Sequence, residues 1–252
     1  MIKILLSGCN GKMGQVIVSC VEARDNCEII AGIDITGEQR NDFPVYKNIN
    51  DFSGNADVII DFSNPKALDG LLDFSVKTNT PAVIATTGLS DDQVIKINEA
   101  SKKVALFFTA NMSIGINLVA ELVKRAATVL EDNFDIEIIE AHHNQKLDAP
   151  SGTANMLANS VLEGCNNEKE LVYDRHTRRQ KRDKDEIGMH AVRGGTIVGE
   201  HSVIFAGRDE IITISHSARS REIFAVGALN AALFMIEKPA RLYNMGDLIG
   251  KC

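Results

Sequence analysis

The chain lacks an apolar stretch long enough to span a bilayer, and it lacks an excess of positive charge. Its 27 lysines and arginines are outnumbered by 34 aspartates and glutamates, which gives a net charge of -7 at pH 7. This balance argues against a general nucleic-acid binder and against a protein held on anionic membranes. The first apolar run, Met1–Leu6, is too short for the core of a signal peptide, so we expect a cytoplasmic location.

Paired cysteines and spaced histidines are also missing. The five cysteines are odd in number and include no Cys-x-x-Cys pair, which favours reduced structural thiols over disulfides or a zinc site. Two of the six histidines, His142 and His143, are adjacent, but neighbouring positions seldom bind one metal ion together. Because no His-x-x-x-His or His-Glu-x-x-His spacing occurs, we expect no metal site.

Apolar strands alternate with helical patterns through the first 112 residues. The predicted strands are Ile2–Ser7, Cys27–Ile33, Val58–Ile60, Pro81–Ala85 and Val104–Phe108. Three helices are expected between these strands. Apolar residues with helical spacing follow residue 12, and a second helix is expected after Pro65. A third should begin at Ser90–Gln93, which has the pattern of a capping box. This alternation predicts a dinucleotide-binding type of α/β domain over residues 1–112, with a doubly wound parallel sheet.

From residue 113 the pattern changes. A long helix around 118–130 precedes an alternating strand at 134–139, and strands at 196–206 and 210–217 follow without helices between them. These features predict a second α+β domain over 113–220 with a mixed sheet. The charged run 175–186 is interpreted as a solvated mobile loop, or alternatively as a segment that attracts an anionic substrate. The C-terminal stretch 221–252 is expected to complete the first domain, with a last amphipathic helix over Arg221–Ile236.

A glycine-rich turn follows the first strand and opens the first helix. Gly8, Gly11 and Gly14 permit a tight turn in which the backbone approaches a pyrophosphate at the helix N-terminus. Asp34 ends the second strand, where a carboxylate can accept hydrogen bonds from an adenosine ribose. We therefore predict dinucleotide binding; the alternative is a glycine-rich turn that binds nothing. Asp34 favours NADH, whereas Lys12 can reach the 2′-phosphate of NADPH, so the preference stays open.

The most specific segment is residues 140–154, Glu-Ala-His-His-Asn-Gln-Lys-Leu-Asp-Ala-Pro-Ser-Gly-Thr-Ala, between a strand and a helix. Histidine exchanges protons near neutral pH, and His142 and His143 are candidates for that role. Lys146 supplies a positive charge or a proton. The hydroxyls and free amide groups of 151–153 at a helix start can hold an anion. Together these residues predict a pocket that binds a carboxylate and moves a proton beside it.

The chain resembles the dihydrodipicolinate reductase family over nearly its whole length. The resemblance is carried by Gly8–Gly14, Asp61–Ser63, Thr86–Gly88, Glu140–Ala154, Val198–His201 and the stretch from His216 to Ser220-Arg221. It implies reduction of 4-hydroxy-tetrahydrodipicolinate with NADH or NADPH, in lysine and diaminopimelate biosynthesis. It further implies a homotetramer of two-domain subunits, with nucleotide on the first domain, the cyclic dicarboxylate substrate on the second, and a hinge between them.

The resemblance also implies residue roles. His142 is expected to be the catalytic acid/base, and Lys146 the proton donor that also pairs with the substrate. Further substrate contacts are expected from His143, Ser151, Gly152, Thr153 and Thr87. Cofactor contacts are expected from Gly8, Asn10, Gly11, Lys12, Met13, Asp34, Phe62, Ala85, Thr87, Asn111 and Met112.

Two positions depart from the family pattern. Ala85 stands where the family commonly has glycine, which is compatible with a negative φ, and Met112 stands where it commonly has phenylalanine. A methionine can cover the nicotinamide through its polarisable sulfur, but ring packing is lost. Two other functions compete with the reductase: another two-domain dehydrogenase acting on an amino acid or aldehyde, and a non-catalytic NAD-binding redox sensor. Dehydrogenases of the first kind lack a segment like residues 140–154. A redox sensor of the second kind needs a DNA-binding pair of helices with a basic face, and the sequence contains no such pair.

Overall fold

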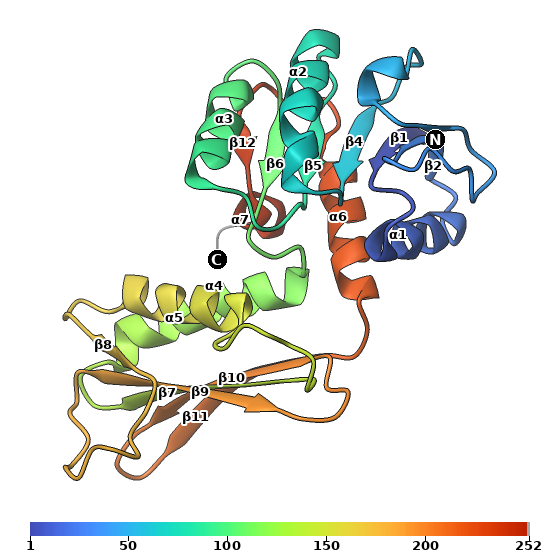
Figure 1. Cartoon of the computed structure of the whole chain (residues 1–252). Helices are drawn as coiled ribbons and strands as arrows, with labels where there is room; N and C mark the ends of the chain where they lie inside the picture. The colour runs from blue at the N-terminus through green and yellow to red at the C-terminus, as the bar shows by residue number, and fades with distance from the viewer. Residues whose placement is uncertain (251–252) are drawn as a thin grey trace. The chain divides into compact units, whose positions relative to one another are not determined.

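The computed structural model describes residues 1–250. The chain divides into two compact units, each with its own sheet (Figure 1). Unit 1 consists of Met1–Ser113 together with the C-terminal stretch that begins at Arg221. Unit 2 is Ile114–Ser220. The predicted fold class, a Rossmann-type parallel sheet plus a second domain with a mixed sheet, is confirmed.

The sheet of unit 1 has seven strands, all paired in parallel. They are β1 (Ile2–Ser7), β2 (Cys27–Ile33), β3 (Val45–Tyr46), β4 (Val58–Asp61), β5 (Ala82–Ile84), β6 (Leu106–Phe108) and β12 (Leu242–Tyr243). Their order is β12-β6-β5-β4-β1-β2-β3, so the winding direction reverses between β1 and β4. In such sheets, ligands bind beyond the carboxyl ends of the two strands at this reversal.

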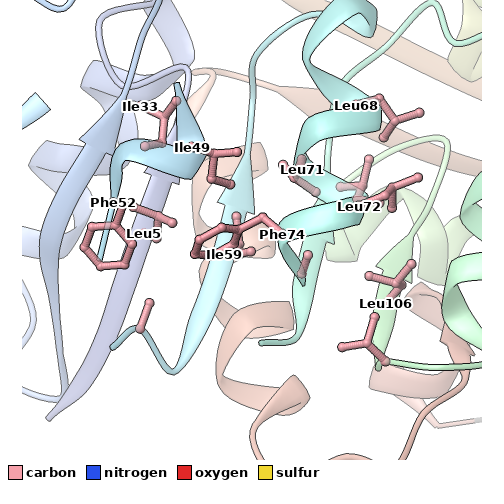
Figure 2. Packing of buried hydrophobic residues seen from close by; sticks show 14 of the residues in the cluster. Leu5, Ile33, Ile49, Phe52, Ile59, Leu68, Leu71, Leu72, Phe74 and Leu106 are labelled. Carbon is pink, nitrogen blue, oxygen red and sulfur yellow. The ribbon is translucent and has the colours of Figure 1, made fainter. Parts of the chain in front are cut away.

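Helices cover the faces of this sheet. They are α1 (Lys12–Glu22), α2 (Leu68–Thr78), α3 (Asp91–Ser101), α6 (Glu222–Met235) and α7 (Met245–Ile249), with 3-10 turns η1 (Ile49–Asp51) and η2 (Pro65–Ala67). Figure 2 shows Leu5 and Ile59 of the strands packed near Leu71 and Phe74 of α2, and all four side chains are buried. The predicted capping box is present, because Ser90 caps α3 and exchanges hydrogen bonds with Gln93.

The helix predicted over Arg221–Ile236 is present as α6, but the stretch from residue 221 to residue 250 is not one continuous helix. The chain instead forms α6, the edge strand β12 and the short helix α7, while residues 251–252 lie outside the described part. Helix α6 is not amphipathic, because apolar residues such as Phe224, Val226 and Leu233 occupy its partly exposed face as well. Gly227 allows the closest approach: a Cβ there would lie 1.7 Å from the backbone oxygen of Met112.

Unit 2 has a mixed five-stranded sheet, as predicted. Its elements are α4 (Ile114–Leu130), β7 (Asp135–His142), α5 (Gly152–Gly164), β8 (Glu170–Val172), β9 (Glu186–Arg193), β10 (Gly199–Ala206) and β11 (Ile211–Ala218). The order is β11-β10-β7-β9-β8, antiparallel on one side of β7 and parallel on the other. Strands β8 and β9 were not predicted, because the sequence of β9, Glu-Ile-Gly-Met-His-Ala-Val-Arg, does not alternate cleanly.

Alternation along β7 directs every second side chain to the face that α4 and α5 cover. Ile136 and Ile138 point to this face and join the core of the unit. Ile139 alternates to the opposite face, as do Val192 of β9 and Ile211 of β11, and these three are 38%, 49% and 69% exposed. One face of the sheet therefore builds the core, and the other presents apolar side chains to solvent.

The charged segment 175–186 is bound to its own unit through three arginines. Arg175 and Arg178 both pair with Glu186. Arg182 donates to Asp135 and to Glu137 of β7, each at 2.9 Å, and its side chain is only 17% exposed. The interpretation of the segment as a purely solvated loop is therefore wrong for these side chains, since they neutralise carboxylates beside the sheet.

Candidate active site

The glycine turn of unit 1 lies against the end of β4. Gly8 has a φ of +79°, and a Cβ there would lie 2.5 Å from the backbone oxygen of Phe62. At Gly14 a Cβ would lie 2.2 Å from the oxygen of Gly8, so both positions require glycine. Gly11 is the N-cap of α1 and has no side chain with which to accept hydrogen bonds from the first turn. The turn thus presents backbone amides at the carboxyl edge of the sheet, where β1 and β4 meet.

Asp34 lies beside this turn. Its carboxylate accepts hydrogen bonds from the backbone N–H of Asn10 at 3.2 Å and from the N–H and hydroxyl of Thr36 at 3.1 and 2.9 Å. The side-chain amide of Asn10 in turn donates to the Thr36 hydroxyl at 3.0 Å. The structure therefore brings the predicted ribose carboxylate next to the glycine turn, with Lys12 at the start of α1. Their roles towards a nucleotide stay predictions.

The buried carboxyl of Asp61, which carried no predicted role, lies at the same edge of the sheet. Asp61 accepts hydrogen bonds from the hydroxyls of Ser63 and Thr86, both at 2.6 Å. Burial raises the pKa of Asp61, against the lowering effect of hydrogen bonds from Ser63, Thr86 and Ser7. Asp61 thereby joins residues at the ends of β1, β4 and β5, and it fixes the turn that leads to the exposed Thr87.

The two departures from the family pattern fit their surroundings in unit 1. Among the described non-glycine residues only Asn79 and Glu237 have a positive φ, so Ala85 has ordinary backbone geometry. Met112 is 4% exposed, and its backbone oxygen lies against Gly227 of α6. Asn111 accepts a hydrogen bond from the backbone N–H of Ser113 at 2.9 Å. Contact of Met112 with a nicotinamide stays a prediction.

In unit 2, the buried face of the sheet carries polar instead of apolar side chains at one end. On the inner face of β7, Ile136 and Ile138 are followed by Glu140 and His142. On β10, His201 stands directly opposite Glu140 in the antiparallel register. The register between β7 and β9 likewise pairs His142 with Arg193. Strand pairing therefore assembles a buried polar row from three strands.

Glu140 is the centre of this row, and only 1% of it is exposed. One carboxylate oxygen accepts from His142 Nδ1 at 2.6 Å and from Arg193 at 2.8 Å. The other accepts from the second guanidinium nitrogen of Arg193 at 2.7 Å and from the backbone N–H of Ser151 at 3.0 Å. The carboxylate thus connects the predicted acid/base His142 with the start of α5.

His142 itself is buried, and its second ring nitrogen, Nε2, faces Gly199. A Cβ at Gly199 would lie 3.1 Å from that nitrogen, which is tighter than ordinary van der Waals contact. The ring of His201 packs edge-on against the His142 ring, with 5.1 Å between centroids. Gly199 therefore leaves the space beside the nitrogen that is not bonded to Glu140.

Ser151 caps α5, and its hydroxyl oxygen accepts from the backbone N–H of Ala154 at 3.1 Å. The same oxygen lies 3.0 Å from His201 Nε2, while His201 Nδ1 has no hydrogen-bond partner among the described residues. Burial, followed by the charge of His142, lowers the pKa of His201 to about 4, so His201 is neutral at neutral pH. A buried N–H without an acceptor is costly, so the proton belongs on Nε2 and is donated to Ser151. The Ser151 hydroxyl proton is then available to another acceptor.

Lys146 lies between His142 and α5 in sequence and pairs with Asp148 at 2.8 Å. Its side chain is 21% exposed, and its charge acts on His201. The hydrogen bond from Lys146 is the main cause that holds the pKa of Asp148 below its ordinary value, and the backbone N–H of Gly152 adds to it. A Cβ at Gly152 would meet nothing within 4 Å, so there is open space beside the start of α5.

The structure therefore brings His142, Lys146, Ser151 and Gly152 into one region, as expected from their nearness in sequence. His143 follows at the end of β7 and is half-buried. Three further residues of the site carried no predicted role: Glu140, Arg193 and His201. Glu140 could have been recognised from the strand period, because it shares a face with His142. His201 and Arg193 reach the site through pairing of strands that are distant in sequence.

Residues 1–250 contain no group of three or more histidine, cysteine, aspartate or glutamate side chains placed to hold a metal ion. None of the helices described is both long and apolar enough to cross a membrane.

Family models match almost the whole chain. The model described as "Dihydrodipicolinate reductase, N-terminus" matches residues 2–112, and the model described as "Dihydrodipicolinate reductase, C-terminus" matches residues 115–249. A protein of Caldanaerobacter subterraneus subsp. tengcongensis named 4-hydroxy-tetrahydrodipicolinate reductase is 51% identical over 251 residues, covering 100% of this chain and 99% of that protein. A protein of the same name from Clostridium novyi is 50% identical over 250 residues, covering 99% and 98%.

Solved structures agree with these relatives. The dipicolinate-bound dihydrodipicolinate reductase from Paenisporosarcina sp. TG-14 superimposes with a TM-score of 0.82 at 26% identity, covering 99% of this chain and 100% of that chain. A probable dehydrogenase from Thermotoga maritima has a TM-score of 0.62 at 14% identity, covering 98% and 92%. At that identity the second likeness shows the fold alone.

Proposed function

The chain belongs to the dihydrodipicolinate reductase family, and from this premise we propose that it reduces 4-hydroxy-tetrahydrodipicolinate with hydride from NADH or NADPH. The observation that carries the proposal is the row of buried Glu140, His142 and His201 beside the start of α5, joined by the partly exposed Arg193. It combines a proton-exchanging nitrogen with hydrogen-bond donors for an anion. A reduction that builds up charge next to carboxylates needs both.

The residues of unit 1 fit a dinucleotide. Gly8 and Gly14 sit where a Cβ would fill the turn, and Gly11 leaves the first amides of α1 uncapped by its own side chain. These amides would hold the pyrophosphate, and Asp34 would accept from the adenosine ribose. When bound, NADH or NADPH supplies the hydride. The further contacts that we propose for the cofactor are Asn10, Lys12, Met13, Phe62, Ala85, Thr87, Asn111 and Met112.

We propose that both nucleotides are used, with a limited preference. Asp34 disfavours a 2′-phosphate through charge repulsion, whereas Lys12 at the start of α1 can attract it. The carboxylate of Asp34 is already held by Asn10 and Thr36, so its position beside the turn does not depend on the nucleotide. The two opposing charges support a modest preference rather than exclusive use of one nucleotide.

The start of α5 would hold a substrate carboxylate. The Ser151 hydroxyl has its proton available, and the space beside Gly152 is open. Lys146 contributes a positive charge and forms an ion pair with Asp148. A substrate carboxylate would compete with Asp148 for Lys146 and for the Gly152 amide. His143, Thr153 and Thr87 complete the substrate contacts that we propose.

Proton movement would fall to His142 and Lys146. Glu140 accepts a hydrogen bond from His142 Nδ1, so Nε2, which lies next to Gly199, is the nitrogen left to act on the substrate. In its protonated form His142 would stabilise the electron density that builds up on the substrate after hydride arrives, and Lys146 would deliver the proton. Gly199 keeps Nε2 uncrowded at this position, because a Cβ there would lie 3.1 Å from the nitrogen.

We also propose a homotetramer in the cytoplasm that acts in lysine and diaminopimelate biosynthesis. The support for an oligomer is the sheet face of unit 2 that presents Ile139, Val192 and Ile211 to solvent, since such faces are commonly buried by association. Light scattering on the purified protein measures the number of copies, and a monomer at micromolar concentration would contradict the assembly.

The proposed reaction is tested by following absorbance of NADH and of NADPH with freshly generated substrate. We expect oxidation of both nucleotides and inhibition by pyridine-2,6-dicarboxylate, the ligand named for the Paenisporosarcina relative. Calorimetry with reduced nucleotide present measures binding of that dicarboxylate directly. The proposal fails if neither nucleotide is oxidised and the dicarboxylate does not bind.

A further inference from the structure

Glu140 is a buried carboxylate to which the proposed reaction gives no direct part. It is 1% exposed and accepts four hydrogen bonds: two from Arg193, one from His142 Nδ1 and one from the amide of Ser151. A carboxyl in an apolar setting would normally lose its charge. Here burial raises the pKa of Glu140, but the hydrogen bonds from Arg193, His142 and Ser151 outweigh burial and hold the pKa below its ordinary value.

Ionised Glu140 can only accept hydrogen bonds, so the 2.6 Å contact requires that His142 Nδ1 carry a proton. In the neutral ring the other nitrogen, Nε2, then has a free lone pair. Nε2 is also the atom beside the space at Gly199. The contact with Glu140 therefore selects which nitrogen of His142 exchanges a proton, and its negative charge stabilises the protonated ring.

We propose that Glu140 is the positioning residue that directs His142 to react through Nε2, and that the positive charge of Arg193, which binds the same carboxylate, opposes the effect of the Glu140 charge on the His142 ring. The proposal rests on the proposed function, because His142 is the acid/base there. Beyond that function, the reaction would depend on the opposite charges of Glu140 and Arg193, neither of which contacts the substrate. The same carboxylate also holds the Ser151 amide, so the acid/base and the start of α5 share one anchor.

Other charged and titratable groups also lie around His142, besides Glu140 and Arg193. The groups that face His142 or its neighbour His201 are Glu140 on β7, Arg193 on β9, His201 on β10, His216 on β11, and Lys146 with Asp148 in the loop. Burial lowers the pKa of both His201 and His216, so neither adds positive charge at neutral pH. Glu140 is therefore the anion that contacts the ring, while Arg193 and Lys146 are the nearby cations.

The test is the pH dependence of kcat/KM in two variants that remove opposite charges. We expect kcat/KM to fall as the pH rises and His142 loses its proton. Glu140→Gln removes the anion, so the fall should move to lower pH. Arg193→Gln removes the cation, so the fall should move up. Glu140→Asp shortens the side chain, so it should lower kcat. Because it retains the charge, the pH of the fall should stay near that of the native protein.

A merely structural role predicts a different result. Loss of packing would lower kcat in all three variants without moving the fall in opposite directions, and that outcome overturns the proposal. Nitrogen NMR of the native protein with labelled histidine gives a second test that needs neither turnover nor a folded variant. We expect the neutral ring of His142 to carry its proton on Nδ1, and a proton on Nε2 instead would overturn the proposal. Because this measurement needs no substrate, it separates failure of the positioning role from failure of the proposed reaction.

Discussion

Gly199→Ala adds one methyl group beside the proposed acid/base, and the structure allows its effect to be worked out. The new Cβ would lie 3.1 Å from His142 Nε2, a few tenths of an ångström too close. The ring cannot easily retreat, because Glu140 holds Nδ1 at 2.6 Å and His201 packs against it. Crowding of this kind costs about 1–3 kcal/mol, and the lower chain entropy of alanine returns about 0.4–1 kcal/mol.

The net expectation for Gly199→Ala is a loss of up to about 2.6 kcal/mol in the free energy of unfolding, which lowers Tm by up to about 10 °C. The methyl group also covers the nitrogen that should exchange the proton, so kcat should fall about tenfold or more. Steady-state kinetics and thermal melts measure both effects.

Gly194→Ala is the matched control for this substitution. A Cβ at Gly194 would meet nothing within 4 Å, and Gly194 is not among the glycines with a positive φ. The control should therefore keep the native kcat and Tm. If Gly199→Ala behaves like Gly194→Ala in both assays, the placement of Nε2 on the open side of the site is wrong.

Two further substitutions test the charges of the site. Lys146→Ala should lower kcat about a hundredfold and raise KM, because it removes a proton donor and a charge that faces a dicarboxylate. Its ion pair with a 59% exposed Asp148 contributes only about 0–1 kcal/mol, so the melt should hardly move. Lys124→Ala, which breaks another 2.8 Å ion pair of unit 2, is the control, and near-normal turnover of Lys146→Ala would refute its role. Asp34→Ala should improve KM for NADPH relative to NADH, whereas Thr36→Val, which disturbs the same hydrogen bonds without removing a charge, should leave the ratio unchanged. Selective loss of NADPH use in Asp34→Ala would show that Asp34 does not lie at the ribose.

Much of unit 1 could be predicted because its signals are local. Buried parallel strands are continuous apolar runs, and β1 and β2 begin and end at the predicted residues. The capping box at Ser90 needs only four consecutive residues, and the glycine turn needs only seven. The C-terminal stretch was predicted less well, because α6 is apolar on its partly exposed face as well as on its buried face and therefore carries no amphipathic period, and because β12 has only two residues.

The sequence by itself determined the two-part architecture, the glycine turn and the dense polar segment from Glu140 to Ala154. Each of these depends on residues that are close together in the chain. Only the tertiary structure decided that Glu140 is the centre of the site, because Arg193 and His201 reach it through the register of β9 and β10 against β7. Register is fixed by which side chains the core accepts, and a shift of one residue would turn His201 to the opposite face. That choice is made by the packing of the whole sheet, which no short segment encodes.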